Sequence, residues 1–87
     1  MKEILKQFEK VCPIEWDRFT KSKHETTCFG WIARSDGGKD FIVLNFSNDA
    51  VNAKDVWFCT SSAKYLERFA KATNQSHTQC TPFNLTP

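Results

Sequence analysis

Apolar residues recur at helical spacing near both ends of this chain. One amphipathic helix is predicted over residues 2–11 and ends before Pro13, because a proline pushes the preceding residue out of the α region. Its apolar face consists of Ile4, Leu5, Phe8 and Val11. A second helix is predicted over residues 63–73, after a run of hydroxyl residues that can cap it. Its predicted core side consists of Ala63, Leu66, Phe69, Ala70 and Thr73.

The middle of the chain has the composition of β-strands. Residues 26–34 and 40–46 are rich in β-branched and aromatic side chains, and residues 35–38 (Ser-Asp-Gly-Gly) form a strong turn signal between them. A β-hairpin is therefore predicted here. A short third strand is predicted over residues 55–59, after a polar loop.

Residues 14–20 leave two interpretations open. Pro13 can occupy the first position of a short helix, in which Trp16 and Phe19 form the buried side. Alternatively, the segment is a loop held in place by the same two aromatic rings. Residues 21–24 are expected to be a solvated linker.

These elements predict an α+β domain of order α-β-β-β-α. Its three-stranded antiparallel sheet would have two helices packed on one face. We expect one compact domain over residues 1–74 and an irregular C-terminal tail over residues 75–87, because the tail is polar and contains two prolines.

The predicted sheet is apolar on both faces, since side chains alternate along a strand. We assign Ile32, Ile42, Leu44 and Phe46 to the face covered by helices. The opposite face then carries one of the third-strand pairs (Val56 with Phe58, or Trp57 with Cys59) together with Phe29, Trp31, Phe41 and Val43. Such a patch needs a cover. Three interpretations of what covers it remain open. The chain itself can cover it, with Trp16 and Phe19 or with Phe83 and Leu85. Otherwise the cover is a protein partner or second copy, or stacked nucleic-acid bases.

Composition narrows the class of protein. The chain has 87 residues, of which 40% are hydrophobic and 14% aromatic, so it has enough apolar surface to fold. Its net charge of +2 is too small to indicate nucleic-acid binding by itself. We expect a cytoplasmic protein with no membrane segment, because the chain starts with an amphipathic pattern and has no long apolar run.

Candidate chemistry is sparse. The four cysteines form no Cys-x-x-Cys pair and are expected to be thiols in a reducing compartment. Two His and two Cys could form a zinc site, but their spacing is not that of a known finger: His24, Cys28, His77 and Cys80. We therefore expect no metal and no cofactor. No nucleophile–base pair or phosphate-binding loop is recognisable, so we expect no enzymatic activity.

The leading hypothesis is a small non-enzymatic protein-binding domain that uses the aromatic sheet face or a strand edge. It would be an inhibitor or accessory protein, of the kind that phages and other mobile elements encode, and a homodimer is one form of it. The alternative is a nucleic-acid-binding domain with a basic ridge on the last helix. The residues of that ridge are Lys21, Lys23, Lys64, Arg68 and Lys71.

Overall fold

The computed structural model describes residues 2–51 and 55–73. Its first element is helix α1 (Lys2–Glu9). Ile4, Leu5 and Phe8 are buried on one side of it, as the apolar spacing predicts. The helix ends two residues earlier than predicted because its last turn tightens. The Val11 N–H donates to the Phe8 carbonyl (3.3 Å), a bond across three residues that closes the α-helix before Pro13.

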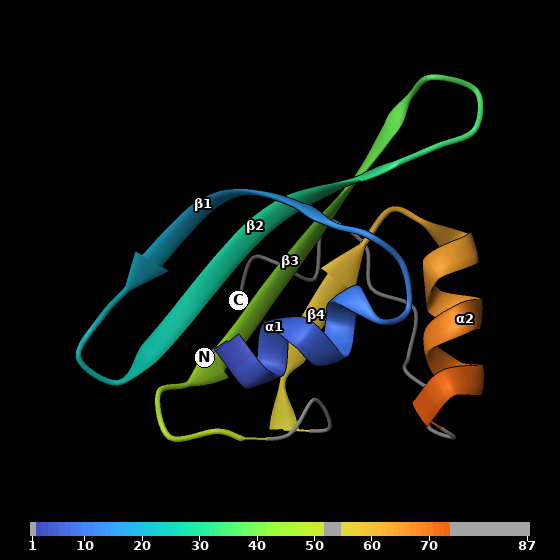
Figure 1. The fold of residues 1–87 in the computed structure, drawn as a ribbon. Helices are drawn as coiled ribbons and strands as arrows, with labels where there is room; N and C mark the ends of the chain where they lie inside the picture. Colours follow the sequence, from blue (N-terminus) through green and yellow to red (C-terminus); the bar gives the residue numbers. More distant parts are fainter. Residues whose placement is uncertain (1, 52–54, 74–87) are drawn as a thin grey trace.

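Four antiparallel strands form one sheet in the order β1-β2-β3-β4 (Figure 1). Their bounds are Glu15–Lys21 for β1, Glu25–Ala33 for β2, Lys39–Ser47 for β3 and Trp57–Thr60 for β4. The α+β class and the antiparallel sheet are confirmed, and the prediction of three strands is wrong. The additional strand is β1; the sequence pattern predicts a short helix or a loop over residues 14–20 instead.

Strand β1 was missed because it has no alternation of buried and exposed positions. Six of its seven residues are exposed and Trp16 is half-buried. Its pairing with β2 is also interrupted by a register shift between Trp16 and Arg18. A strand of this kind forms because its backbone pairs with the free edge of β2. Such pairing does not require alternating apolar side chains, so the hydrophobic pattern does not reveal it.

The predicted hairpin is confirmed; β2 begins and ends one residue earlier than predicted, and β3 extends one residue further at each end. The Arg34 N–H donates to the Gly38 carbonyl (2.8 Å), and the Gly37 N–H donates to the Arg34 carbonyl (3.2 Å). Gly37 has φ of 90°, a left-handed conformation that favours glycine, so the turn requires it. Strand β4 begins and ends later than the predicted third strand.

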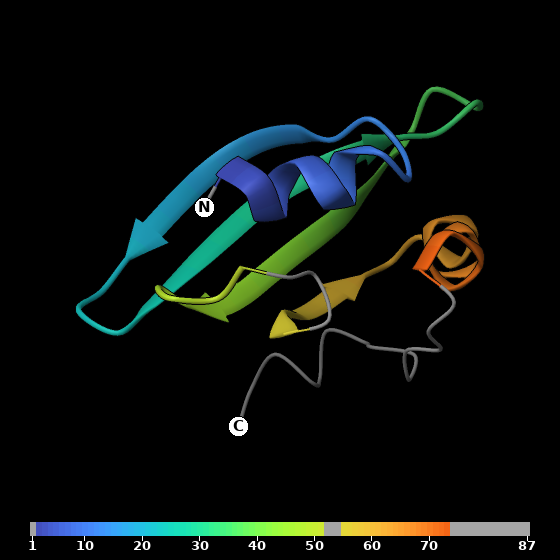
Figure 2. The same cartoon turned by 60° about the horizontal axis from the view of Figure 1, so that its bottom comes forward.

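The core lies on the face of the sheet that α1 covers (Figure 2). Ile32, Ile42, Leu44 and Phe46 are all buried there, as predicted. Phe58 of β4, which is aligned with Leu44, contacts rings from both helices. Its ring centroid lies 5.2 Å from that of Phe8 and 4.8 Å from that of Phe69.

Helix α2 (Ala63–Thr73) has the predicted bounds. Ser62 caps it, because its side-chain oxygen accepts the Tyr65 N–H at 3.0 Å. The predicted core side is partly wrong: Ala63 is exposed, whereas Tyr65 is 1% exposed. Tyr65 can be buried because its hydroxyl finds a partner, the carbonyl of Phe8.

The three cysteines that the structure describes are in two states. Cys12 and Cys28 are free thiols. Cys59 is disulfide-bonded, so the prediction that all the cysteines are thiols is wrong at this position, and its partner lies outside the described residues. The predicted domain boundary at residue 74 and the predicted tail also lie outside the described residues. Neither of the helices described is long and apolar enough to cross a membrane.

Candidate functional site

The strand register gathers the predicted partner-binding residues on one face. Phe29 is paired with Val43, and Trp31 with Phe41, so all four side chains project from the same side of the sheet. The Phe29 and Trp31 rings meet edge to face, with centroids 5.1 Å apart and planes at 88°. We call this side, opposite the core, the aromatic face.

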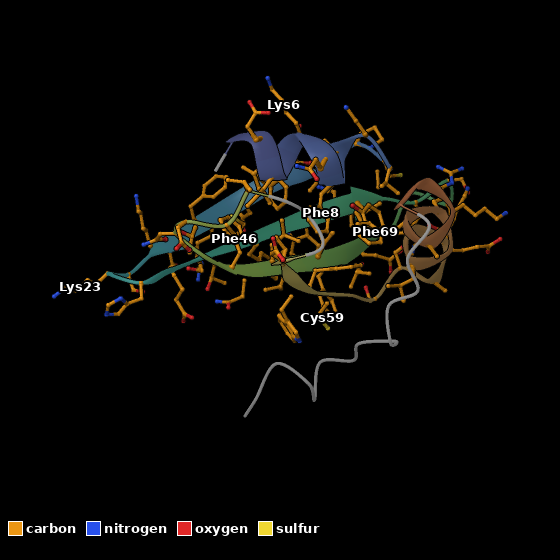
Figure 3. All side chains as sticks on the ribbon, turned by 90° about the horizontal axis from the view of Figure 1, so that it is seen from below. Lys6, Phe8, Lys23, Phe46, Cys59 and Phe69 are labelled. Atoms are coloured by element: carbon orange, nitrogen blue, oxygen red, sulfur yellow. The ribbon has the colours of Figure 1, made fainter. Side chains whose placement is uncertain are left out.

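The aromatic face has a buried floor and half-exposed rings. Phe29, Trp31 and Phe41 are half-buried, whereas Val43 is only 8% exposed and Cys59 is not exposed at all. Figure 3 shows Cys59 on the side of the sheet away from Phe8. Val43 therefore lies beneath the surface, and the three rings supply the accessible part of these four side chains.

Trp57 belongs to this face and was not among the predicted binding residues. It is aligned with Asn45 and is 42% exposed. Alternation along the third strand offered two pairs for this face, and the structure places Trp57 and Cys59 there rather than Val56 and Phe58. A signal for Trp57 was therefore present in the sequence, although it did not decide between the pairs.

Polar side chains border the rings at both ends of the aromatic face. At one end, Lys39 Nζ lies 3.5 Å from Glu15 Oε2, across the strand that carries Trp31. At the other end, the Asn45 amide donates to the Thr27 hydroxyl at 2.9 Å. Arg18 is aligned with Phe29 on the outer strand. An apolar centre with a polar border is the usual anatomy of a protein–protein interface.

Trp16 and Phe19 do not cover the aromatic face. Their places in the register, opposite Gly30 and Cys28, put both on the core side of the sheet. The Trp16 indole N–H donates to Glu9 of α1 at 2.7 Å, which fixes the ring there. This part of the predicted internal cover is therefore wrong, and the other part, Phe83 and Leu85, lies outside the described residues.

The residues of the predicted basic ridge fall into two groups. Lys21 and Lys23 lie at the β1–β2 connection, and Figure 3 places Lys23 at the opposite end of the molecule from Phe69 of α2. On α2, Lys71 Nζ lies 3.4 Å from Glu67 Oε1. Lys64 and Arg68 share the same helix, one turn apart. The structure therefore does not join these cations into one continuous surface.

The candidate metal residues do not meet within the described part of the chain. His24 lies in the turn after β1, whereas Cys28 is fully buried in the core. Burial raises the pKa of the Cys28 thiol to about 11, which keeps it protonated and disfavours metal ligation. Residues 2–51 and 55–73 contain no group of three or more side chains suited to a metal ion.

Comparisons with known proteins give no further guide. The chain matches no protein-family model, and searches of curated proteins and of solved structures found no significant similarity to it. The aromatic face and the remaining surface are therefore the features that bear on its function.

Proposed function

We propose that this chain is a non-enzymatic protein-binding domain and that the aromatic face is its interface. One observation carries the proposal: Phe29, Trp31, Phe41 and Trp57 leave ring surface accessible on a single face. Aromatic rings in a partly desolvated patch contribute most of the affinity in many interfaces. We further propose that both helices pack on the opposite face. The contacts of the Phe58 ring with Phe8 of α1 and Phe69 of α2 support this arrangement.

The aromatic face is a better interface than either strand edge. The outer strand β1 has a register shift after Trp16, and its exposed positions include Glu15, Asp17 and Arg18. Irregular pairing and charged side chains are the features by which proteins discourage a partner strand. The other edge, β4, has only four residues, so it offers a short ladder.

A second copy of the chain is the partner that fits this face best. The border carries both signs of charge, with Arg18 and Lys39 beside Glu15. A two-fold interface has to be self-complementary, and a border of mixed charge meets that requirement. Two aromatic faces would then pack as sheets do, about 10 Å apart with their rings interdigitated.

As a biological role, we propose an inhibitor or accessory protein, because a small binding domain, alone or as a dimer, suits such work. Binding of nucleic acid along a basic ridge gains no support from the arrangement. Lys71 is neutralised by Glu67, and the β1–β2 cations lie far from α2. Generic nucleic-acid binding requires a continuous run of free cations.

Mass in solution tests the proposal. We expect the mass of the wild type to rise toward twice the 10.1 kDa of one chain as its concentration rises. A suitable range is about 1 μM to about 1 mM, which covers weak specific association. We expect Trp31→Ala to stay at the mass of one chain while keeping its circular-dichroism spectrum.

The matched control is Phe19→Ala, because Phe19 is 49% exposed but lies on the core side of β1. This variant should associate as the wild type does. A wild type that keeps the mass of one chain at every concentration would contradict self-pairing. Unfolding of Trp31→Ala would show instead that the ring belongs to the core.

A further inference from the structure

A pocket of about 430 Å³ lies between the β2–β3 hairpin and the first turns of α2. Both of these elements stand at the same end of the sheet in Figure 1. Ile32 and Tyr65 supply apolar lining, and both are buried. The pocket is lined by none of the rings of the aromatic face. Its volume is in the range of sites that hold small molecules.

The two walls of the pocket differ in charge. On the hairpin wall, Arg34 contacts both carboxylates: Nε lies 3.1 Å from Asp36 Oδ1, and Nη1 lies 3.5 Å from Asp40 Oδ1. On the α2 wall, Lys64 and Arg68 have no carboxylate within 4.0 Å among residues 2–51 and 55–73. The second wall therefore has two cations whose charge the described part of the chain leaves unneutralised.

The two helix cations are placed so that one ligand group can meet both. Residues four apart on a helix are neighbours on its surface, and two like charges there repel each other. The next cation along α2, Lys71, is balanced by Glu67. An anion between Lys64 and Arg68 would relieve their repulsion. A doubly charged phosphate suits this pair, because arginine binds its oxygens with a planar fork and lysine adds a point charge.

The hairpin wall offers acceptors to the rest of such a ligand. Asp40 is held in place by the Ser61 hydroxyl, which donates to its Oδ1 at 3.1 Å. The Asp36 carboxylate also accepts the Gly38 N–H at 2.9 Å, so it is fixed in the turn. Carboxylates that are fixed in this way can accept further hydrogen bonds from hydroxyl groups.

We propose that this pocket binds a small phosphorylated compound that carries hydroxyl groups. Its phosphate lies between Lys64 and Arg68, and its hydroxyl groups face Asp36 and Asp40. The pocket contains none of the four accessible rings of the aromatic face, so a ligand in it would not need that interface.

Titration of the full ¹⁵N-labelled chain, followed by NMR, tests the proposal. The probes are ribose 5-phosphate, inorganic phosphate and ribose, each compared with sodium chloride at matched ionic strength. We expect saturable shifts of the Lys64, Arg68 and Arg34 amides with ribose 5-phosphate. Weaker saturable shifts are expected with inorganic phosphate and none with ribose, because the charged pair supplies most of the attraction.

Charge-removing variants then locate the site. Arg68→Gln and Lys64→Gln should each weaken ribose 5-phosphate binding by about tenfold, the effect of losing one charged hydrogen bond. Lys71→Gln is the matched control on the same helix and should leave the affinity within about twofold, because Glu67 already balances that charge. All three side chains are exposed, so the folded spectrum should persist in each variant.

Three results would overturn the proposal. One is the absence of saturable shifts beyond those that sodium chloride produces. Another is equal weakening by Lys71→Gln and Arg68→Gln. The third is tighter binding of a single-stranded oligonucleotide at the same amides, which would assign these cations to nucleic acid instead.

Discussion

The Tyr65 hydroxyl donates a hydrogen bond to the backbone carbonyl of Phe8, at 2.7 Å, and so joins the two helices across 57 residues of sequence. Both side chains are buried, and their rings both lie near Phe58 of β4. Burial raises the pKa of Tyr65 well above its ordinary range. The phenol therefore stays protonated and remains a donor at any physiological pH.

Removal of this hydroxyl should destabilise the fold modestly. The Phe8 carbonyl also accepts the Val11 N–H at 3.3 Å, so it keeps a partner when the phenol is lost. We expect Tyr65→Phe to lower the free energy of unfolding by about 1 kcal/mol, the net value of one hydrogen bond. Urea denaturation measures this.

Lys64→Gln serves as the control for Tyr65→Phe, since Lys64 is exposed on the same helix. Its free energy of unfolding should stay within about 0.5 kcal/mol of the wild type. If both variants unfold at the wild-type midpoint, the link between the helices contributes nothing measurable.

The free energy of unfolding should fall as the pH rises above about 9. Burial raises the pKa of Cys28 from 9.0 to about 11, and the pKa of Tyr65 moves in the same direction. A group with a raised pKa stabilises the fold fully below its unfolded pKa. That contribution is lost as the pH rises toward the folded pKa, because the unfolded chain releases its proton first.

Urea denaturation at several pH values between about 8 and about 10.5, a range that spans the unfolded thiol pKa, measures this slope. We expect a smaller fall for Cys28→Ala, in which the buried thiol is absent. An identical slope in the wild type and in Cys28→Ala would show that the thiol does not contribute.

Gly30 allows β1 to lie close against β2. A Cβ added there would lie 2.9 Å from the Glu15 carbonyl oxygen, from Ile14 and from Trp16. The backbone oxygen cannot move without shifting the strand. We expect Gly30→Ala to lower the free energy of unfolding by about 1–3 kcal/mol, the range seen for overpacked sites.

Gly38→Ala is the matched control for Gly30→Ala. The three atoms nearest to a Cβ at residue 38 all belong to the Arg34 guanidinium group, the end of a flexible side chain, which can move aside at the cost of its exposed ion pairs with Asp36 and Asp40. Its cost should be below about 1 kcal/mol, the value of an exposed ion pair. Equal costs for the two variants would mean that β1 does not depend on close contact at Gly30.

The sequence predicted the parts of the fold that have a local cause. The β2–β3 hairpin follows from its Asp-Gly-Gly turn, and the start of α2 from the Ser62 cap. Strand β1 could not be recognised because nearly all its side chains are exposed and its stability comes from pairing with β2. The burial of Tyr65 depends on a carbonyl 57 residues away, which no local pattern reveals.

The aromatic face, like the fold, could be predicted from the sequence only where its cause is local. Alternation alone placed Phe29, Trp31 and Phe41 together, because the register of a hairpin follows from its turn. It did not show that Val43 would be buried between them, since its exposure depends on the neighbouring strand. The pocket beside α2 was not visible at all, because its walls are more than 20 residues apart in the chain.

The three tryptophan indoles test the central claim most directly. Trp31 and Trp57 lie on the aromatic face, whereas the Trp16 indole is bonded to Glu9 on the core side. ¹⁵N NMR spectra of the full chain, recorded over a dilution series, resolve the indole N–H of each. We predict that the Trp31 and Trp57 signals shift with concentration while the Trp16 signal stays fixed. Signals from Trp31 and Trp57 that do not move at any concentration would contradict pairing through this face.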